Sequence, residues 1–273
     1  MSEILSDAEL LRYNRQIVLK SFDFEGQEAL KQARVLVIGA GGLGCAASQY
    51  LAVAGVGHLT LVDFDRVELS NLQRQVLHTD ERIGMYKVDS AALALRALNP
   101  WLKVETHAAV ADEALLDTLL PRHQLVLDCT DNLAIRNLLN QKARQHRVPL
   151  VSGAAIRLEG QLCSFTWQED EPCYACLSAL FGEQALTVEA GVSPPASRRE
   201  CWPPWWDWWA ACKRWKPSSC LAGMGKSYSG RLLMIDGLSG TFREMKLPKR
   251  PDCPVCSHRV KHATNGTSKK PNP

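Results

Sequence analysis

Three glycines stand between a hydrophobic strand and a helix, at a place where a backbone can bind phosphate. Gly39, Gly41 and Gly44 form the pattern GxGxxG directly after the run ARVLVI, and Gly42 shares the turn. Such a turn lets the backbone approach a phosphate, and the amino end of the next helix offers unpaired N–H groups. Asp63, about twenty residues on, is placed to bind ribose hydroxyls. The pattern predicts an adenine nucleotide and leaves NAD, FAD and ATP open.

The segment after Asp63 separates these options, because it contains two cations, Arg74 and Lys87. A neutral nicotinamide has no obvious need for them. A reaction at a triphosphate does, since charge builds on the attacked phosphate and on the leaving pyrophosphate. We therefore expect a nucleotide site that includes both cations and the polar residues around them, Asp65, Asn71 and Gln75.

A later strand ends in the polar sequence CTDN, which contains Asp131 and Asn132. Open α/β sheets bind their ligands at the carboxyl ends of their strands, so both residues are expected at the nucleotide site. A carboxylate there can hold Mg²⁺, which makes Asp131 a candidate catalytic residue beside Arg74 and Lys87.

Four cysteines have the spacing of a zinc site. Cys173 and Cys176 form one CxxC pair, and Cys253 and Cys256 form a second. Four thiolates suit tetrahedral Zn²⁺ and leave no coordination position open, so a structural role is expected. A redox dithiol is the alternative for either pair alone.

Alternating strands and helices are predicted to position these residues. Strands are expected at 33–38, 58–65, 103–107 and 124–132, and helices at 7–13 (capped by Asp7), 26–32, after the glycine turn, and at 87–98, 111–120 and 136–147. This order predicts a doubly wound, Rossmann-like α/β fold with helices on both faces of a parallel sheet. Further strands and a zinc-binding region are expected to extend it.

The composition is that of a globular enzyme, with 46% hydrophobic residues and a net charge of +3. The small basic excess gives no reason to expect nucleic acid or an anionic membrane as a partner. No apolar run is long enough to cross a bilayer, and the N-terminus is charged from its third residue, unlike a secretory signal. A cytoplasmic location is expected.

Several motifs together resemble the bacterial adenylyltransferases related to ubiquitin-activating enzymes, the ThiF/HesA family, and within it those that act on molybdopterin synthase. They are RYNRQI, VLVIGAGGLGCAASQYLAVAGVG, LTLVDFDRVELSNLQRQ, LVLDCTDN, VPLVSGAAIRLEGQ and PCYACL. The resemblance covers about residues 5–192 and 221–256.

The resemblance implies a reaction between Mg-ATP and the C-terminal glycine of a small β-grasp sulfur carrier, the small subunit of molybdopterin synthase. It implies a homodimer in which Arg15 of RYNRQ reaches into the neighbour's active site. The chain would divide into an N-terminal helical segment (1–30), a nucleotide-binding region (31–150), a carrier-binding and zinc region (151–256) and a disordered tail (257–273).

Other functions remain open at this point. The substrate can be another one in the same superfamily, namely the thiazole-pathway carrier or a tRNA base. A NAD-dependent oxidoreductase uses the same glycine pattern. A protein without catalytic activity is a further alternative, if the chain cannot form its dimer.

One segment, 193–220, fits no element of this fold, because it places six of the eight tryptophans between Trp202 and Trp215. Tryptophan has a single codon, TGG, so codons 205–210 are partly known. Read from the third base of the codon for Pro204, they give one codon NTG and then spell Val-Gly-Leu-Val-Gly, which resembles the small-residue apolar helix that relatives carry here. We interpret the segment as a frameshifted translation, from a sequencing error or a gene lesion. The alternative is a true insertion that forms an exposed aromatic patch.

Sequencing the gene across codons 187–223 tests this interpretation. We expect the bases to spell the apolar helix in the shifted frame. A corrected read with one continuous frame would indicate an error in the record, and confirmed base changes would indicate a lesion. If the codons do not spell the helix, the frameshift hypothesis is wrong and the segment is an insertion.

Overall fold

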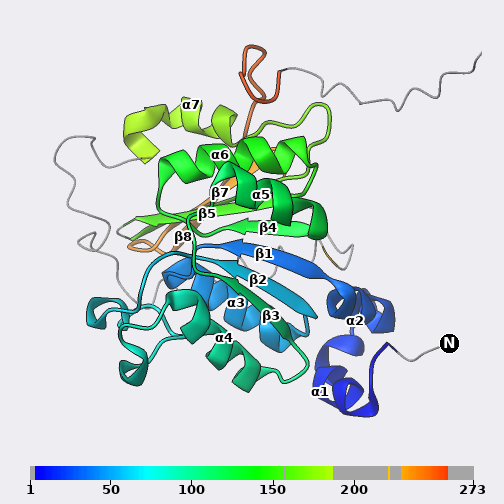
Figure 1. Cartoon of the computed structure of the whole chain (residues 1–273). Helices are drawn as coiled ribbons and strands as arrows, with labels where there is room; N and C mark the ends of the chain where they lie inside the picture. Colours follow the sequence, from blue (N-terminus) through cyan, green and yellow to red (C-terminus); the bar gives the residue numbers. More distant parts are fainter. Residues whose placement is uncertain (1–3, 157, 187–220, 222–228, 258–273) are drawn as a thin grey trace, which may run out of the picture.

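The computed structural model describes residues 4–156, 158–186, 221 and 229–257 (Figure 1). Within them, eight strands form one sheet in the order β3-β2-β1-β4-β5-β6-β7-β8. The predicted frameshift at 193–220 and nearly all of the predicted disordered tail lie outside the described residues. Both stay predictions.

The first five strands in this order are parallel and form the nucleotide-binding half that the sequence predicts. They are β1 (Arg34–Ile38), β2 (His58–Val62), β3 (Lys103–His107), β4 (Leu125–Asp128) and β5 (Leu150–Ile156). The helices are α1 (Asp7–Ile17), α2 (Asp23–Gln32), α3 (Gly42–Ala54), α4 (Lys87–Leu98), α5 (Glu113–Leu119), α6 (Leu133–Gln145) and α7 (Tyr174–Leu186).

Alternating side chains of each strand pack on opposite faces of the sheet. In β1, Val35 and Val37 join the core that includes α3 and α4, whereas Leu36 and Ile38 join the core of α5, α6 and α7. Because both faces are covered, the strand is an unbroken apolar run. Helices lie on both sides of the sheet in Figure 1. The predicted doubly wound α/β fold is confirmed.

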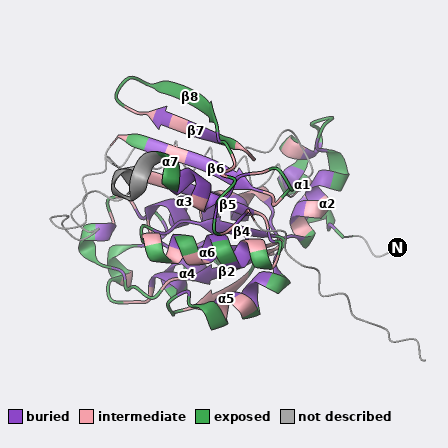
Figure 2. Cartoon of the chain, turned by 90° about the horizontal axis from the view of Figure 1, so that it is seen from above, coloured by how far each residue is buried: buried purple, intermediate pink, exposed green. Residues whose placement is uncertain are grey.

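The sheet continues beyond β5 with three antiparallel strands, β6 (Glu159–Phe165), β7 (Arg231–Asp236) and β8 (Thr241–Lys246). The region from 151 onwards therefore shares one sheet with the nucleotide-binding half. At the far edge, every residue of β8 is exposed, as Figure 2 shows.

The ends of several helices are fixed by side-chain caps. The predicted cap at Asp7 is wrong: Ser6 precedes the helix, its hydroxyl accepts a hydrogen bond from Glu9 N at 3.4 Å, and the Glu9 carboxylate accepts one from Ser6 N at 3.1 Å. Asp112 caps α5 and Asn132 caps α6, each with a side-chain oxygen that accepts a hydrogen bond from a backbone N–H. Among the described helices, none has the length and apolar composition needed to span a bilayer.

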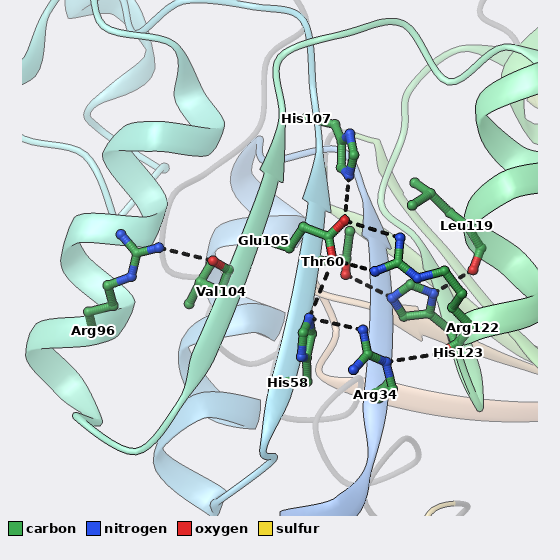
Figure 3. Close-up of polar contacts among 10 residues, drawn as sticks. All are labelled: Arg34, His58, Thr60, Arg96, Val104, Glu105, His107, Leu119, Arg122 and His123. Carbon is green, nitrogen blue, oxygen red and sulfur yellow. Dashed lines mark hydrogen bonds and ion pairs between the residues drawn. The ribbon is translucent and has the colours of Figure 1, made fainter.

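A polar network ties strands β2 and β3 to the loop before β4 (Figure 3). Glu105 accepts hydrogen bonds from His107 at 3.0 Å and from Arg122 at 2.9 Å, and His123 Nε2 lies 2.8 Å from the hydroxyl of Thr60. Burial lowers the pKa of His123 to about 4, so this ring is neutral at physiological pH. The network ties the edge strand β3 to its neighbours.

Candidate active site

A cavity of about 380 Å³ lies at the carboxyl ends of β1, β2 and β4. Its size falls within the range of small-molecule sites. Of the predicted nucleotide-binding residues, all except Gly44 line it: Gly39, Gly41, Gly42, Asp63, Asp65, Asn71, Arg74, Gln75, Lys87, Asp131 and Asn132. The fold thus gathers around one cavity residues that the sequence spreads over more than ninety positions.

The glycines of the turn have different physical roles. Gly39 has a φ of +97°, and an added Cβ would lie 2.7 Å from the carbonyl oxygen of Cys129. At Gly44 a Cβ would lie 1.8 Å from the carbonyl oxygen of Gly39, so this glycine is needed for the packing of α3. At Gly41 the nearest atom is Gln75 Nε2 at 3.8 Å. Within the part of the chain that the structure describes, no atom lies close enough to require a glycine there, and the space that it leaves open belongs to the cavity.

Asp63 holds the glycine turn in place. One of its carboxylate oxygens accepts a hydrogen bond from Ala40 N at 2.7 Å, and the other accepts one from Asp65 N at 2.8 Å. Burial raises the pKa of Asp63, while the charge of Lys87 and the two amides oppose that rise. Each carboxylate oxygen can accept a further hydrogen bond, so the predicted contact with ribose remains available.

Cations and unpaired acceptors line the cavity together. Lys87 forms an ion pair with Asp65 at 2.7 Å, and Arg74 donates to the carbonyl of Ser70 at 3.1 Å. Asn71 Oδ1 and Gln75 Oε1 are buried without a hydrogen-bond partner among the described residues. Buried polar atoms are normally paired, so these two are suited to a bound ligand or its water.

The turn after β4 is held by residues that the sequence analysis missed. Asp128 is buried and accepts hydrogen bonds from Thr130 and from the hydroxyl of Ser152 at 2.7 Å. Arg136 lies in the cavity wall, donates to the carbonyl oxygens of Thr130 and Gly153, and is 3.7 Å from Asp128. A charged residue at the end of an apolar strand was the available signal for Asp128.

Asn132, which follows the same turn, also has a structural role. Asn132 lines the cavity, but its side-chain oxygen caps α6 by accepting from Ile135 N at 3.1 Å, which leaves its amide group for a ligand.

Arg15 is exposed on α1 and is not in the cavity wall. In Figure 1, α1 and α2 lie beside the amino end of β1, whereas the cavity lies at the carboxyl ends of the strands. The predicted role of Arg15 in a neighbouring subunit stays a prediction.

The four predicted metal ligands meet in one buried cluster. The sulfur atoms of Cys173, Cys176, Cys253 and Cys256 all lie within 4.8 Å of one another. Cys173 and Cys253 are 3.6 Å apart, and Cys176 and Cys256 are 3.4 Å apart. Sulfurs around tetrahedral Zn²⁺ with ~2.3 Å bonds lie roughly 3.8 Å apart, so the cluster fits this ion.

The surroundings of the cluster also favour a cation. Burial raises the pKa of Cys173 to about 11, because a thiolate in an apolar site is costly. A bound divalent cation would offset that cost for several thiolates at once. Backbone amides already point at two of the sulfurs, since Arg250 N donates to Cys176 and Cys256 N donates to Cys253, both at 3.5 Å.

Comparison with known proteins identifies the family of this chain. The sequence model of the ThiF family matches residues 13–255. The chain belongs to the ThiF family. The family expected from the sequence motifs is therefore confirmed.

Relatives of similar length are adenylyltransferases by name. The chain is 56% identical over 253 residues to the molybdopterin-synthase adenylyltransferase of Escherichia coli, an alignment that covers 92% of this chain and 98% of the relative. It is 52% identical to the Haemophilus influenzae protein of the same name, over 89% and 97% of the two chains. The expected enzyme class, an adenylyltransferase, agrees with both.

Solved structures share the fold. PaaA superimposes with a TM-score of 0.76 at 26% identity, covering 92% of this chain and 77% of PaaA. Escherichia coli MccB, solved with ATP, gives a TM-score of 0.77 at 20% identity, covering 94% and 76%. These likenesses support the Rossmann-like arrangement described above.

Two glycine substitutions should separate packing from ligand binding. Gly44→Ala should lower the thermal midpoint of unfolding, because overpacking of this kind costs about 1–3 kcal/mol. Gly41→Ala should leave the midpoint nearly unchanged and weaken binding of Mg-ATP by about tenfold or more, because the methyl group enters the cavity. Differential scanning fluorimetry and isothermal titration calorimetry measure both. Equal destabilisation by the two variants would contradict this assignment.

Proposed function

We propose that this protein adenylates the C-terminal glycine of a small β-grasp sulfur carrier, the small subunit of molybdopterin synthase, using Mg-ATP. The observation that carries the proposal is the cavity in which an open glycine turn faces Arg74, Lys87 and two unpaired buried acceptors. The 56% identity to a molybdopterin-synthase adenylyltransferase supports this choice of carrier.

The reaction needs no general base, because a terminal carboxylate with a pKa of about 3.5 is ionised at neutral pH. A carboxylate oxygen attacks the α-phosphorus of ATP, a new P–O bond forms, and the bond to the bridging oxygen of pyrophosphate breaks. The products are an acyl-adenylate and pyrophosphate. Catalysis then consists of positioning and of neutralising charge on the phosphates.

The residues of the cavity divide this work among them. The backbone at Gly41 and Gly42 and the amino end of α3 bind phosphate oxygens, and Asp63 binds the ribose. Lys87, held by its ion pair with Asp65, and Arg74 offset the negative charge of the phosphates in the transition state. Asp131, which is exposed at the cavity rim, holds the magnesium ion that arrives with ATP.

Two further features complete the proposed enzyme. The cysteine cluster binds Zn²⁺ and ties residues 253–256 to the start of α7, which gives it a structural role. The protein acts as a homodimer, in which Arg15 contributes to the neighbour's active site. A NAD-dependent reaction is disfavoured, because it does not account for the two cations beside the glycine turn.

Exchange of labelled pyrophosphate into ATP tests the proposal. We expect exchange only when the carrier has a free C-terminal glycine, and none when that carboxylate is amidated. Arg74→Ala should lower the exchange rate by about a hundredfold or more, because the loss of one transition-state contact has effects of that order. Arg96→Ala, an exposed arginine on α4, is the matched control and should exchange normally.

The choice of carrier is decided by the same assay. Exchange with the thiazole-pathway carrier, and none with the molybdopterin-synthase subunit, would contradict the proposed substrate. Absence of exchange with any carrier, together with tight binding of NADH, would contradict the proposed reaction.

A further inference from the structure

The cysteine cluster and the cavity meet at two neighbouring residues. Cys173 contributes its sulfur to the cluster, and Tyr174, the next residue, lies in the cavity wall. Both side chains are buried. Because one peptide bond joins them, whatever holds Cys173 also constrains the position of Tyr174.

Asn140 on α6 contacts this junction from the neighbouring helix. The side chain is completely buried, and its Oδ1 accepts a hydrogen bond from Tyr174 N at 2.9 Å. Its Nδ2 has no hydrogen-bond partner among the described residues. This side chain thus holds the backbone amide at the start of α7, one residue after Cys173.

Arg136 lies one turn before Asn140 on the same helix, and it contacts Tyr174 in the cavity wall. Its guanidinium carbon is 5.9 Å from the centre of the Tyr174 ring. The same guanidinium binds the carbonyl oxygens of Thr130 and Gly153, so it fixes the turn that presents Asp131. An unbroken set of contacts therefore runs from the cluster through Tyr174 to the cavity wall.

We propose that Asn140 is a positioning residue that couples metal binding at the cysteine cluster to nucleotide binding in the cavity. A metal ion that fixes Cys173 also fixes Tyr174. Asn140 holds the amide of Tyr174 against α6, the helix that also carries Arg136. Coupling between two sites is reciprocal, so Mg-ATP must in turn strengthen the hold on the metal. This inference rests on the proposed nucleotide site.

Release of zinc to a chromogenic chelator, from the full-length metal-loaded protein, measures this coupling. Saturating Mg-ATP should slow zinc release about fivefold or more in the wild type, a size typical of coupling between sites. In Asn140→Ala the release should be faster without nucleotide, and Mg-ATP should no longer slow it. Asn137→Ala, an exposed asparagine on the same helix, is the matched control and should behave as the wild type.

A second variant keeps the test decisive if Asn140→Ala does not fold. Asn140→Leu keeps a similar volume and removes the acceptor for Tyr174 N, so it should release zinc faster and lose the effect of Mg-ATP. Asn140→Asp retains that acceptor and should keep the effect. If Mg-ATP binds the wild type by calorimetry but does not slow zinc release, or slows it equally in the wild type and in Asn140→Ala or Asn140→Leu, the coupling is refuted. If Mg-ATP does not bind the wild type, the proposed function itself fails.

Discussion

The site depends on one close approach, that of the amino end of α3 to the carbonyl of Gly39. Only a residue without a Cβ can occupy position 44, because any side chain would collide with that oxygen. The approach directs the unpaired N–H groups of the helix toward the space in front of Gly41. Asp63, directly after β2, accepts a hydrogen bond from Ala40 N, and Cys129, directly after β4, donates its backbone N–H to the carbonyl of Ile38 at the start of the turn. Three parallel strands thus meet at the point where the phosphates are expected.

The other half of the molecule holds the remaining wall of the cavity. Strands β5 and β6 contribute Ala154, Ala155 and Gln161 to that wall, so the antiparallel part of the sheet also forms part of the site. The cysteine cluster then joins the segment after β8 to the start of α7. Tyr174 lies in the cavity wall and directly follows Cys173 of the cluster, so this residue belongs to both neighbourhoods.

Sequence reasoning identified the residues whose roles follow from local pattern. The glycine turn, Asp63 and the two CxxC pairs have fixed spacings, and the parallel strands bring Arg74, Lys87 and Asp131 to the same edge. It missed Asp128, Arg136 and Asn140, because their partners lie on elements that are distant in the sequence. The predicted cap of α1, Asp7, lies one residue after the observed cap, Ser6. Both residues have suitable side chains, and only the backbone geometry decides between them.

In the proposed reaction, a carrier carboxylate attacks the α-phosphorus of ATP in this cavity. The most direct measurement uses a carrier whose terminal carboxylate is labelled with ¹⁸O, followed by mass spectrometry of the AMP formed when hydroxylamine cleaves the product at its carbonyl carbon. We expect one labelled oxygen in AMP, because the attacking oxygen stays on phosphorus. Unlabelled AMP, or label only in inorganic phosphate, would contradict it.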